Sequence, residues 1–136
     1  MLQLSQNIEE AKKQLNSGNI ELSIIILTLC IEWMGAMIDK KPLKAPKQTK
    51  KRFDMAINKL LGGNYAALNR DSFFYEHWRN QLIHTGKPSS LFIITTNKEL
   101  KHLSKNEDKK IIFNPDVFLI DIESAFKKII AETSKK

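Results

Sequence analysis

The sequence predicts a mainly α-helical bundle of about four principal helices, with a small antiparallel β-hairpin before the last helix. Apolar residues recur at spacings of three and four through most of the chain, which is the period of an amphipathic helix. After Gly86 the pattern changes, and residues 91–96 and 111–113 form short runs rich in β-branched and aromatic residues. A length of 136 residues, with 42% hydrophobic and 27% charged content, is ordinary for one soluble globular domain, so we expect a single domain over residues 1–136.

Two helices are predicted in the first 38 residues. The first, residues 3–16, has an apolar face and ends at Gly18. That face consists of Leu4, Ile8, Ala11 and Leu15. Asn19 is the predicted cap of the second helix, residues 20–38, which is apolar nearly all round and is therefore expected at the centre of the bundle.

A narrow polar stripe interrupts this second helix. It consists of Thr28, Glu32 and Gly35, which follow helical spacing. A carboxylate in such a helix is costly to bury unless it is paired. Either Glu32 lies at the rim beside a lysine or a backbone donor, or the stripe faces the helix at residues 72–86 and Glu32 holds Arg79 or His84 in place.

The net charge of +7 comes from one segment. Residues 40–52 contain seven basic residues and no acidic one, while the rest of the chain contains fifteen of each sign. This proline-containing connection has a composition that buries nothing. It is either a solvated loop or an arm that attracts phosphates by releasing counterions. The candidate RNA-binding residues are Lys47, Lys50, Lys51 and Arg52.

A short third helix and a longer central helix follow. Phe53, Ile57, Leu60 and Leu61 form the apolar face of the third helix. Gly62 and Gly63 end it, and residues 64–70 form a turn or helical fragment. The central helix, residues 72–86, is capped by Asp71 or Ser72 and ends at Gly86. Its buried stripe is Phe74, Trp78 and Leu82.

The remaining residues predict the hairpin and the last helix. The strands at 91–96 and 111–113 are joined by a long charged loop. Asn114, Pro115 and Asp116 then supply a cap, a proline at the first position and an acid near the positive end of the helix. The last helix has a wide apolar face of Phe118, Ile122, Ala125 and Ile129, with Phe126 and Ile130 alongside.

Polar groups that can carry chemistry lie along one side of the central helix. Tyr75 and Arg79 are four residues apart, and so are Asn80 and His84 near its C-terminal end, where a charged histidine is favoured by the helix dipole. The run Arg79 to His84, RNQLIH, resembles the signature of the HEPN family (higher eukaryotes and prokaryotes nucleotide-binding domains): an arginine, commonly followed by a polar residue, and a histidine four to six positions after the arginine.

The resemblance implies a HEPN-like helical bundle and a metal-independent endoribonuclease of toxin or defence type. Such proteins cleave RNA to 2′,3′-cyclic phosphate and 5′-hydroxyl ends. The implied catalytic residues are His84 for proton transfer, Arg79 for the developing phosphate charge and Asn80 for orientation. Glu32 and Tyr75 are candidate supporting residues. Expected partners are RNA, a second copy in a homodimer, and an antitoxin or partner protein.

The helical geometry adds a condition to this interpretation. Five residues place Arg79 and His84 about 140° apart on a regular helix. Either the last turn loosens before Gly86, or another surface completes the site. The resemblance implies a two-fold dimer whose paired motifs line one cleft. A catalytically silent HEPN-like module that binds RNA, a nucleotide or a protein is the alternative function.

Other chemistry is poorly supported by the sequence. His77 and His84 lie on one face but about 10.5 Å apart along the helix, too far to ligate one metal, and His102 lies in a predicted loop without an obvious partner. We expect no metal and no cofactor. The single Cys30 favours a reducing compartment. With no secretion signal and a longest uncharged apolar run of ten residues, Leu22 to Ile31, we expect a cytoplasmic protein and no membrane span.

Overall fold

A computed structural model describes residues 2–39 and 47–134 of the chain. The described residues are mainly helical with one small sheet. The α-helices are α1 (Leu2–Asn16), α2 (Ile20–Ile38), α3 (Thr49–Ala56), α4 (Gly63–Leu68), α5 (Asn80–Thr85) and α6 (Pro115–Ser134). Two π-helical stretches, η1 (Ile57–Leu61) and η3 (Tyr75–Arg79), and a 3-10 turn, η2 (Arg70–Ser72), lie between them. The strands are β1 (Phe92–Ile94) and β2 (Ile111–Phe113).

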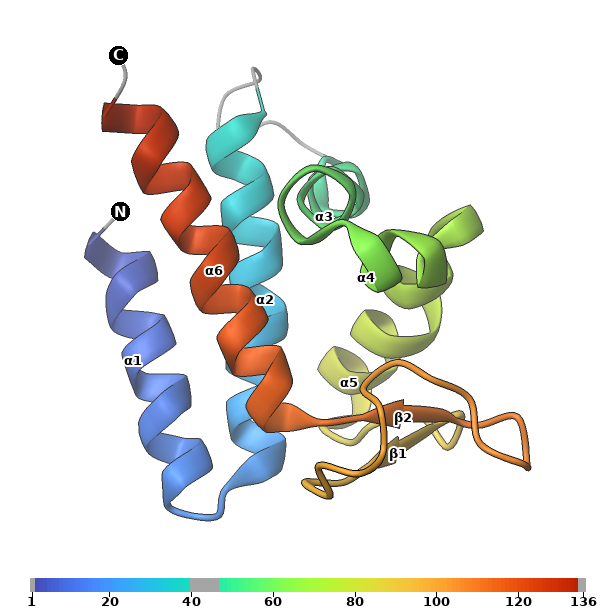
Figure 1. Cartoon of the computed structure of the whole chain (residues 1–136). Coiled ribbons are helices and arrows are strands. Elements are labelled where there is room, and N and C mark those ends of the chain that lie inside the picture. The colour runs from blue at the N-terminus through green and yellow to red at the C-terminus, as the bar shows by residue number, and fades with distance from the viewer. Residues whose placement is uncertain (1, 40–46, 135–136) are drawn as a thin grey trace.

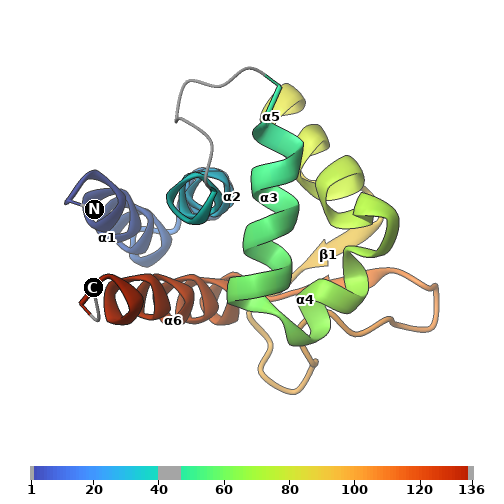
Figure 2. The same cartoon turned by 90° about the horizontal axis from the view of Figure 1, so that it is seen from above.

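The helices form two groups joined by α3. Helix α1 runs antiparallel to α2 and α6, and these three long helices pack side by side (Figure 1). Helix α3 packs on α2, and the chain from Gly63 to Thr85 lies on the far side of α3 (Figure 2). The helical character predicted from the sequence is therefore confirmed for the described residues.

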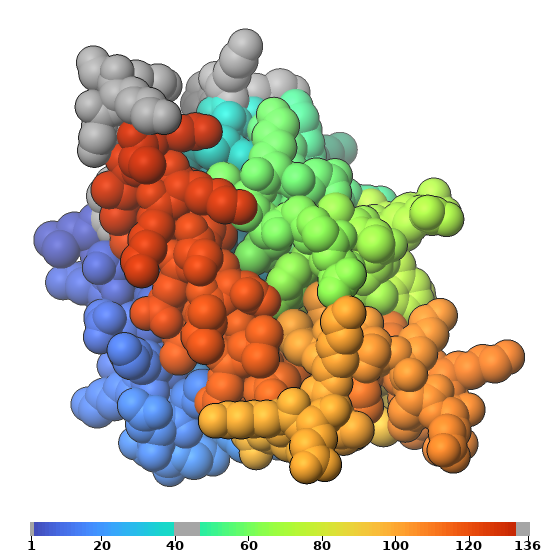
Figure 3. Space-filling model, viewed as in Figure 1, coloured from blue at the N-terminus to red at the C-terminus, as the bar shows by residue number. Residues whose placement is uncertain are grey.

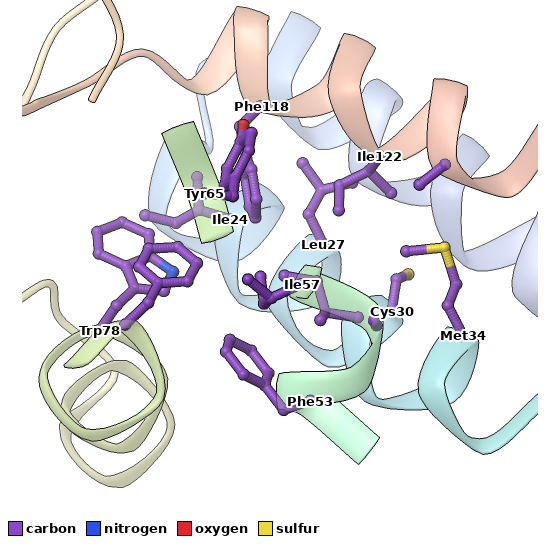
Figure 4. Packing of buried hydrophobic residues seen from close by; sticks show 14 of the residues in the cluster. Ile24, Leu27, Cys30, Met34, Phe53, Ile57, Tyr65, Trp78, Phe118 and Ile122 are labelled. Atoms are coloured by element: carbon purple, nitrogen blue, oxygen red, sulfur yellow. The ribbon is translucent and has the colours of Figure 1, made fainter. Parts of the chain in front are cut away.

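One hydrophobic core connects both groups (Figure 4). Trp78 is fully buried and its ring stacks on Phe113 with 4.0 Å between the ring centroids. The predicted apolar faces point into this core, because the following residues are all buried: Leu4, Ile8, Ala11, Phe74, Trp78, Leu82, Phe118, Ile122, Ala125 and Ile129. Burial of such side chains supplies the main favourable free energy of folding.

The helix ends follow the sequence only in part. Asn114 Oδ1 accepts the Asp116 N–H at 2.9 Å, and Gly86 ends α5 in the left-handed conformation, both as predicted. Asn19 occupies the predicted N-cap position of α2, but its side chain caps no N–H group of the helix, because its amide donates to Gln14 Oε1 at 2.7 Å.

The predicted cap of the central helix is wrong. Asp71 and Ser72 both have positive φ, of 54° and 59°, in the turn before that helix. The Ser72 hydroxyl donates to Asp54 Oδ2 at 2.7 Å, while Asn69 Oδ1 accepts the Tyr75 N–H at 3.1 Å. The capping side chain therefore comes from one turn earlier than the sequence pattern indicated.

The two predicted strands pair in parallel, so the antiparallel hairpin is wrong as predicted. Phe92 faces Ile111 and Ile94 faces Phe113 in a parallel register. The opposite edge of β2 is occupied by the segment before it, since Ile112 donates to Ser104 O at 2.8 Å and Asn106 donates to Lys110 O at 2.9 Å. The long loop thus pairs antiparallel with one edge of β2, and β1 pairs with the other edge.

The basic connection is shorter than predicted, because α3 begins at Thr49. Residues 40–46 lie outside the described residues. The prediction that this segment buries nothing is wrong for Arg52, which is buried and whose Nε lies 3.0 Å from Asp39 Oδ2.

Helix α2 is, within the described part of the chain, the one helix long and apolar enough to cross a membrane. The core helix of a soluble protein has the same composition, and α2 packs against α1, α3 and α6 with eight buried residues. The structure is therefore compatible with a soluble protein. Cys30 belongs to this buried face, and burial raises the pKa of its thiol to about 12, so it is no nucleophile at neutral pH.

Helices α2 and α3 approach each other closely at Gly35. A Cβ atom placed on Gly35 would lie 1.9 Å from the carbonyl oxygen of Arg52. Backbone atoms of a packed helix cannot move out of the way as a flexible side chain can. Only glycine therefore allows this separation of the two helices.

Replacing Gly35 with alanine should lower the free energy of unfolding by about 1–3 kcal/mol, even though alanine favours helix formation, because the two helices must move apart. Chemical denaturation monitored by circular dichroism measures this change. The control is Glu21→Ala on the exposed surface of the same helix, which should stay within about 0.5 kcal/mol of wild type. A Gly35→Ala protein as stable as wild type would contradict the close approach.

Candidate functional site

The polar stripe of α2 faces the helix that carries the RNQLIH run. The indole Nε1 of Trp78 donates to Thr28 Oγ1 at 3.0 Å, and both side chains are buried. In the next turn of α2, Glu32 forms an ion pair with the Nε of Arg79. Of the two interpretations of Glu32, the structure thus shows the pairing with Arg79.

Arg79 is held by three neighbours. Besides the contact with Glu32, its Nη1 donates to Asn80 Oδ1 at 3.0 Å, and its guanidinium carbon lies 5.4 Å from the centre of the Tyr75 ring. The side chains of Arg79 and Glu32 are only 14% and 15% exposed. A guanidinium has five N–H donors, so Arg79 keeps donors for a further acceptor. Burial raises the pKa of Tyr75, and the charge of Arg79 opposes that rise.

His84 lies apart from this cluster. It is exposed, and no side chain in the described ranges forms a hydrogen bond with it. Helix α5 is regular from Asn80 to Thr85, and the Gly86 N–H donates to Leu82 O at 2.8 Å. The last turn therefore does not loosen, and Arg79 and His84 stay about 140° apart.

The irregular turn of this helix comes earlier, in the π-helical stretch η3. The Asn80 N–H there donates to Tyr75 O, five residues back. Wider turns of this kind occur frequently at functional sites. This one ends where the consecutive residues Trp78 and Arg79 both reach α2. The structure therefore brings Arg79, Asn80, Tyr75 and Glu32 together and leaves His84 outside.

Three of the four predicted RNA-binding residues lie together. Lys47, Lys50 and Lys51 line a surface hollow of about 510 Å³, which we call the basic hollow. Its other lining residues are Asp54, Met55, Asn58 and Lys59. Lys59 was missed by the sequence interpretation, although it follows Lys51 by eight residues, about two helical turns. Arg52 faces the opposite way, into its ion pair with Asp39.

The basic hollow adjoins the motif helix. Lys50 Nζ lies 3.2 Å from Glu76 Oε1, and Glu76 precedes Arg79 by three residues. Among the described residues, four lysines and one carboxylate, Asp54, line the hollow. Both oxygens of Asp54 already accept hydrogen bonds, from Asn69 Nδ2 and from Ser72 Oγ, each at 2.7 Å. The hollow therefore presents a net positive charge close to the RNQLIH run.

A second polar cluster was not predicted at all. His102, Tyr65 and Asp121 form a hydrogen-bonded chain, with 2.8 Å between His102 Nε2 and Tyr65 Oη and 2.7 Å between Tyr65 Oη and Asp121 Oδ2. The expectation that His102 has no partner is wrong. No spacing in the sequence could have indicated this cluster, because its members lie 37 and 56 residues from Tyr65.

Neither metal ligation nor similarity to known proteins adds a function. Within residues 2–39 and 47–134, no group of three His, Cys, Asp or Glu side chains could hold one metal ion. Comparisons with protein-family models, with curated proteins and with solved structures find no match for this chain. The functional argument therefore depends on the geometry of the site.

Removing Glu32 should destabilise the protein, because it leaves the largely buried charge of Arg79 without its partner. We expect Glu32→Ala to cost about 1–3 kcal/mol of unfolding free energy. The double variant Glu32→Ala/Arg79→Ala should lose less than the sum of the two single variants, since the pair is then removed as a unit. Chemical denaturation of the wild type and the three variants measures the coupling free energy between Glu32 and Arg79. Strictly additive losses would show that the ion pair contributes nothing to stability.

Proposed function

We propose that this chain is a HEPN-like, metal-independent endoribonuclease of toxin or defence type that acts in the cytoplasm. The observation that supports this function best is the fixed position of Arg79, which Glu32, Asn80 and Tyr75 hold on the helix that also carries the exposed His84. An arginine held in this way is suited to bind a phosphate in a defined orientation.

The proposed reaction needs only proton transfer and charge stabilisation. The ribose 2′-oxygen forms a bond to the adjacent phosphorus and gives its proton to a base. The bond between phosphorus and the 5′-oxygen of the next nucleotide breaks, and that oxygen takes up a proton, which leaves a 2′,3′-cyclic phosphate and a 5′-hydroxyl. Histidine suits both proton transfers near neutral pH, so His84 is the proposed acid–base group. Arg79 stabilises the negative charge that develops on the phosphate oxygens.

The separation of Arg79 and His84 favours a cleft formed by two copies of the chain. An exposed apolar stripe runs along α2 and offers a surface for the second copy: Leu22, Leu29, Trp33 and Met37, which are 46%, 37%, 45% and 39% exposed. Leu29 lies about 60° from Glu32 around the helix, so this stripe borders the Arg79 cluster. A two-fold contact there would place the RNQLIH runs of both copies near one interface.

The basic hollow is the proposed path of the RNA backbone toward this cleft. Lys50 and Lys51 lie in the first turn of α3 and Lys47 lies just before it, and the pair of Lys50 with Glu76 connects the hollow to the motif helix. Lysines beside phosphates add affinity that is independent of sequence, because they release counterions.

A second candidate is a catalytically silent module that binds RNA, a nucleotide or a protein such as an antitoxin. The engagement of Arg79 by Glu32 favours this candidate, since the carboxylate already satisfies the Nε donor and neutralises the charge that a substrate phosphate would use. The two candidates differ in one measurable respect, which is the breaking of the RNA chain.

The wild-type protein should cleave mixed RNA in the presence of a chelator, and His84→Ala should reduce the rate by about 10²–10⁴-fold, the usual contribution of a positioned acid or base. End-group analysis should find 2′,3′-cyclic phosphates. The matched control is His77→Ala, an exposed histidine of the same helical segment, which should keep its activity. RNA binding without cleavage would select the silent module.

The same assay tests the two-copy cleft. Trp33→Glu places a charge in the apolar stripe and should convert a sedimenting dimer into monomers that no longer cleave. Ile120→Glu, a change of the same kind on an exposed residue of α6, should leave both properties unchanged. A wild-type protein that is monomeric at micromolar concentration and still cleaves RNA would exclude the composite cleft.

Neutralising the basic hollow should weaken RNA binding and its dependence on salt. With Lys47, Lys50 and Lys51 changed to alanine, the slope of log affinity against log salt should flatten by about 0.7 for each lost phosphate contact on single strands. A control with the same change of charge carries alanine at Lys105, Lys109 and Lys110. An equal loss in both proteins would mean that only net charge attracts RNA.

A further inference from the structure

A pocket of about 590 Å³ lies on another face of the molecule. Three segments form it: the end of η1 with the start of α4, residues 98–103 of the loop before β2, and residues 114–128 at and after the start of α6. These segments meet on the face shown in Figure 3. The volume falls within the range of pockets that bind small molecules.

The polar chain of His102, Tyr65 and Asp121 forms one wall of this pocket. The Asn114 N–H donates to His102 Nδ1 at 2.9 Å, so that nitrogen carries no proton. Burial lowers the pKa of His102 to about 4, which keeps the imidazole neutral at pH 7 with its proton on Nε2. His102 Nε2 therefore donates to Tyr65 Oη, and the Tyr65 hydroxyl donates to Asp121 Oδ2.

This directed chain fixes Asp121 as a hydrogen-bond acceptor. Tyr65 is 5% exposed, and burial raises the pKa of its phenol, so its hydroxyl remains a donor at neutral pH. Burial also raises the pKa of Asp121, and the hydrogen bond from Tyr65 opposes that rise. No described residue donates to the other carboxylate oxygen, Oδ1. Because Asp121 lines the pocket, this second oxygen is available to a donor group of a ligand.

Positively charged side chains line the same pocket as the Asp121 carboxylate. Lys98, Lys101 and Lys128 line the same pocket, whereas Asp121 is its one acidic residue among those described. Lys128 Nζ donates to Leu60 O at 2.7 Å, which holds its ammonium group at the pocket and leaves two N–H donors unused. The pocket thus combines a positive rim with a single fixed acceptor.

We propose that this pocket binds a small phosphorylated molecule that carries a free hydroxyl group. The phosphate lies among the three lysines, because ammonium groups are common phosphate ligands. The hydroxyl group donates to Asp121 Oδ1. A cation is disfavoured by the three lysines.

Ribose 5-phosphate is a suitable probe, because it carries both groups. Isothermal titration of the whole protein should detect binding of ribose 5-phosphate in the millimolar range or tighter, and no binding of ribose. Lys98→Glu/Lys101→Glu should weaken this binding by about tenfold or more. Asp121→Asn should weaken the binding of ribose 5-phosphate but not that of inorganic phosphate, because inorganic phosphate loses no contact and is freed from one repelling carboxylate.

The control is Lys109→Glu/Lys110→Glu, which changes net charge equally at exposed residues of the same loop outside the pocket. This variant should bind ribose 5-phosphate as wild type does. An equal loss in both double variants would overturn the proposal, as would the absence of binding by wild type at millimolar probe. A short RNA that displaces ribose 5-phosphate from the wild-type protein, and that binds the pocket variants more weakly, would identify a macromolecular ligand. That result would also overturn the proposal.

Discussion

The packing of the RNQLIH helix and α3 against one polar stripe of α2 is the constraint on which the rest of the structure depends. Glu32 and Gly35 lie on one face of α2, and Asp39, the residue directly after this helix, follows Gly35 at a spacing of four. Glu32 pairs with Arg79, Asp39 pairs with Arg52, and Gly35 lets the backbone of α3 approach closely. Because buried charges are costly without partners, this face fits only one arrangement of its neighbours.

The pair of Glu32 and Arg79 has opposite consequences for the proposed catalysis. It restricts the guanidinium to one orientation, which reduces the entropy lost when a phosphate binds. It also supplies an anion, the Glu32 carboxylate, that would compete with a substrate phosphate for the guanidinium. Which of these two effects is larger depends on the local dielectric constant, because excluding water from the proposed cleft would strengthen every interaction with the guanidinium.

The two concave surfaces of the molecule have η1 in common. Asn58 and Lys59 line the basic hollow, whereas Leu60 and Leu61 line the pocket that contains His102. Lys128 also bonds to Leu60 O, which ties α6 to the same stretch. Segment η1 therefore contributes residues to both surfaces, and it has the π-helical form that occurs frequently at functional sites.

The sequence by itself determined the helices and their buried faces, because the period of apolar residues decides which side of a helix avoids water. It also indicated that the stripe at Glu32 needs a partner, since a carboxylate on an apolar helix is costly. It could not determine the strand pairing, because β2 has two edges and only the folded loop shows that residues 103–106 occupy one of them. The tertiary structure alone decided that Asn69 caps the central helix, that Arg52 is buried, and that Tyr65, His102 and Asp121 meet. Contacts between residues distant in the chain leave no periodic pattern, because they depend on how whole elements pack rather than on local spacing.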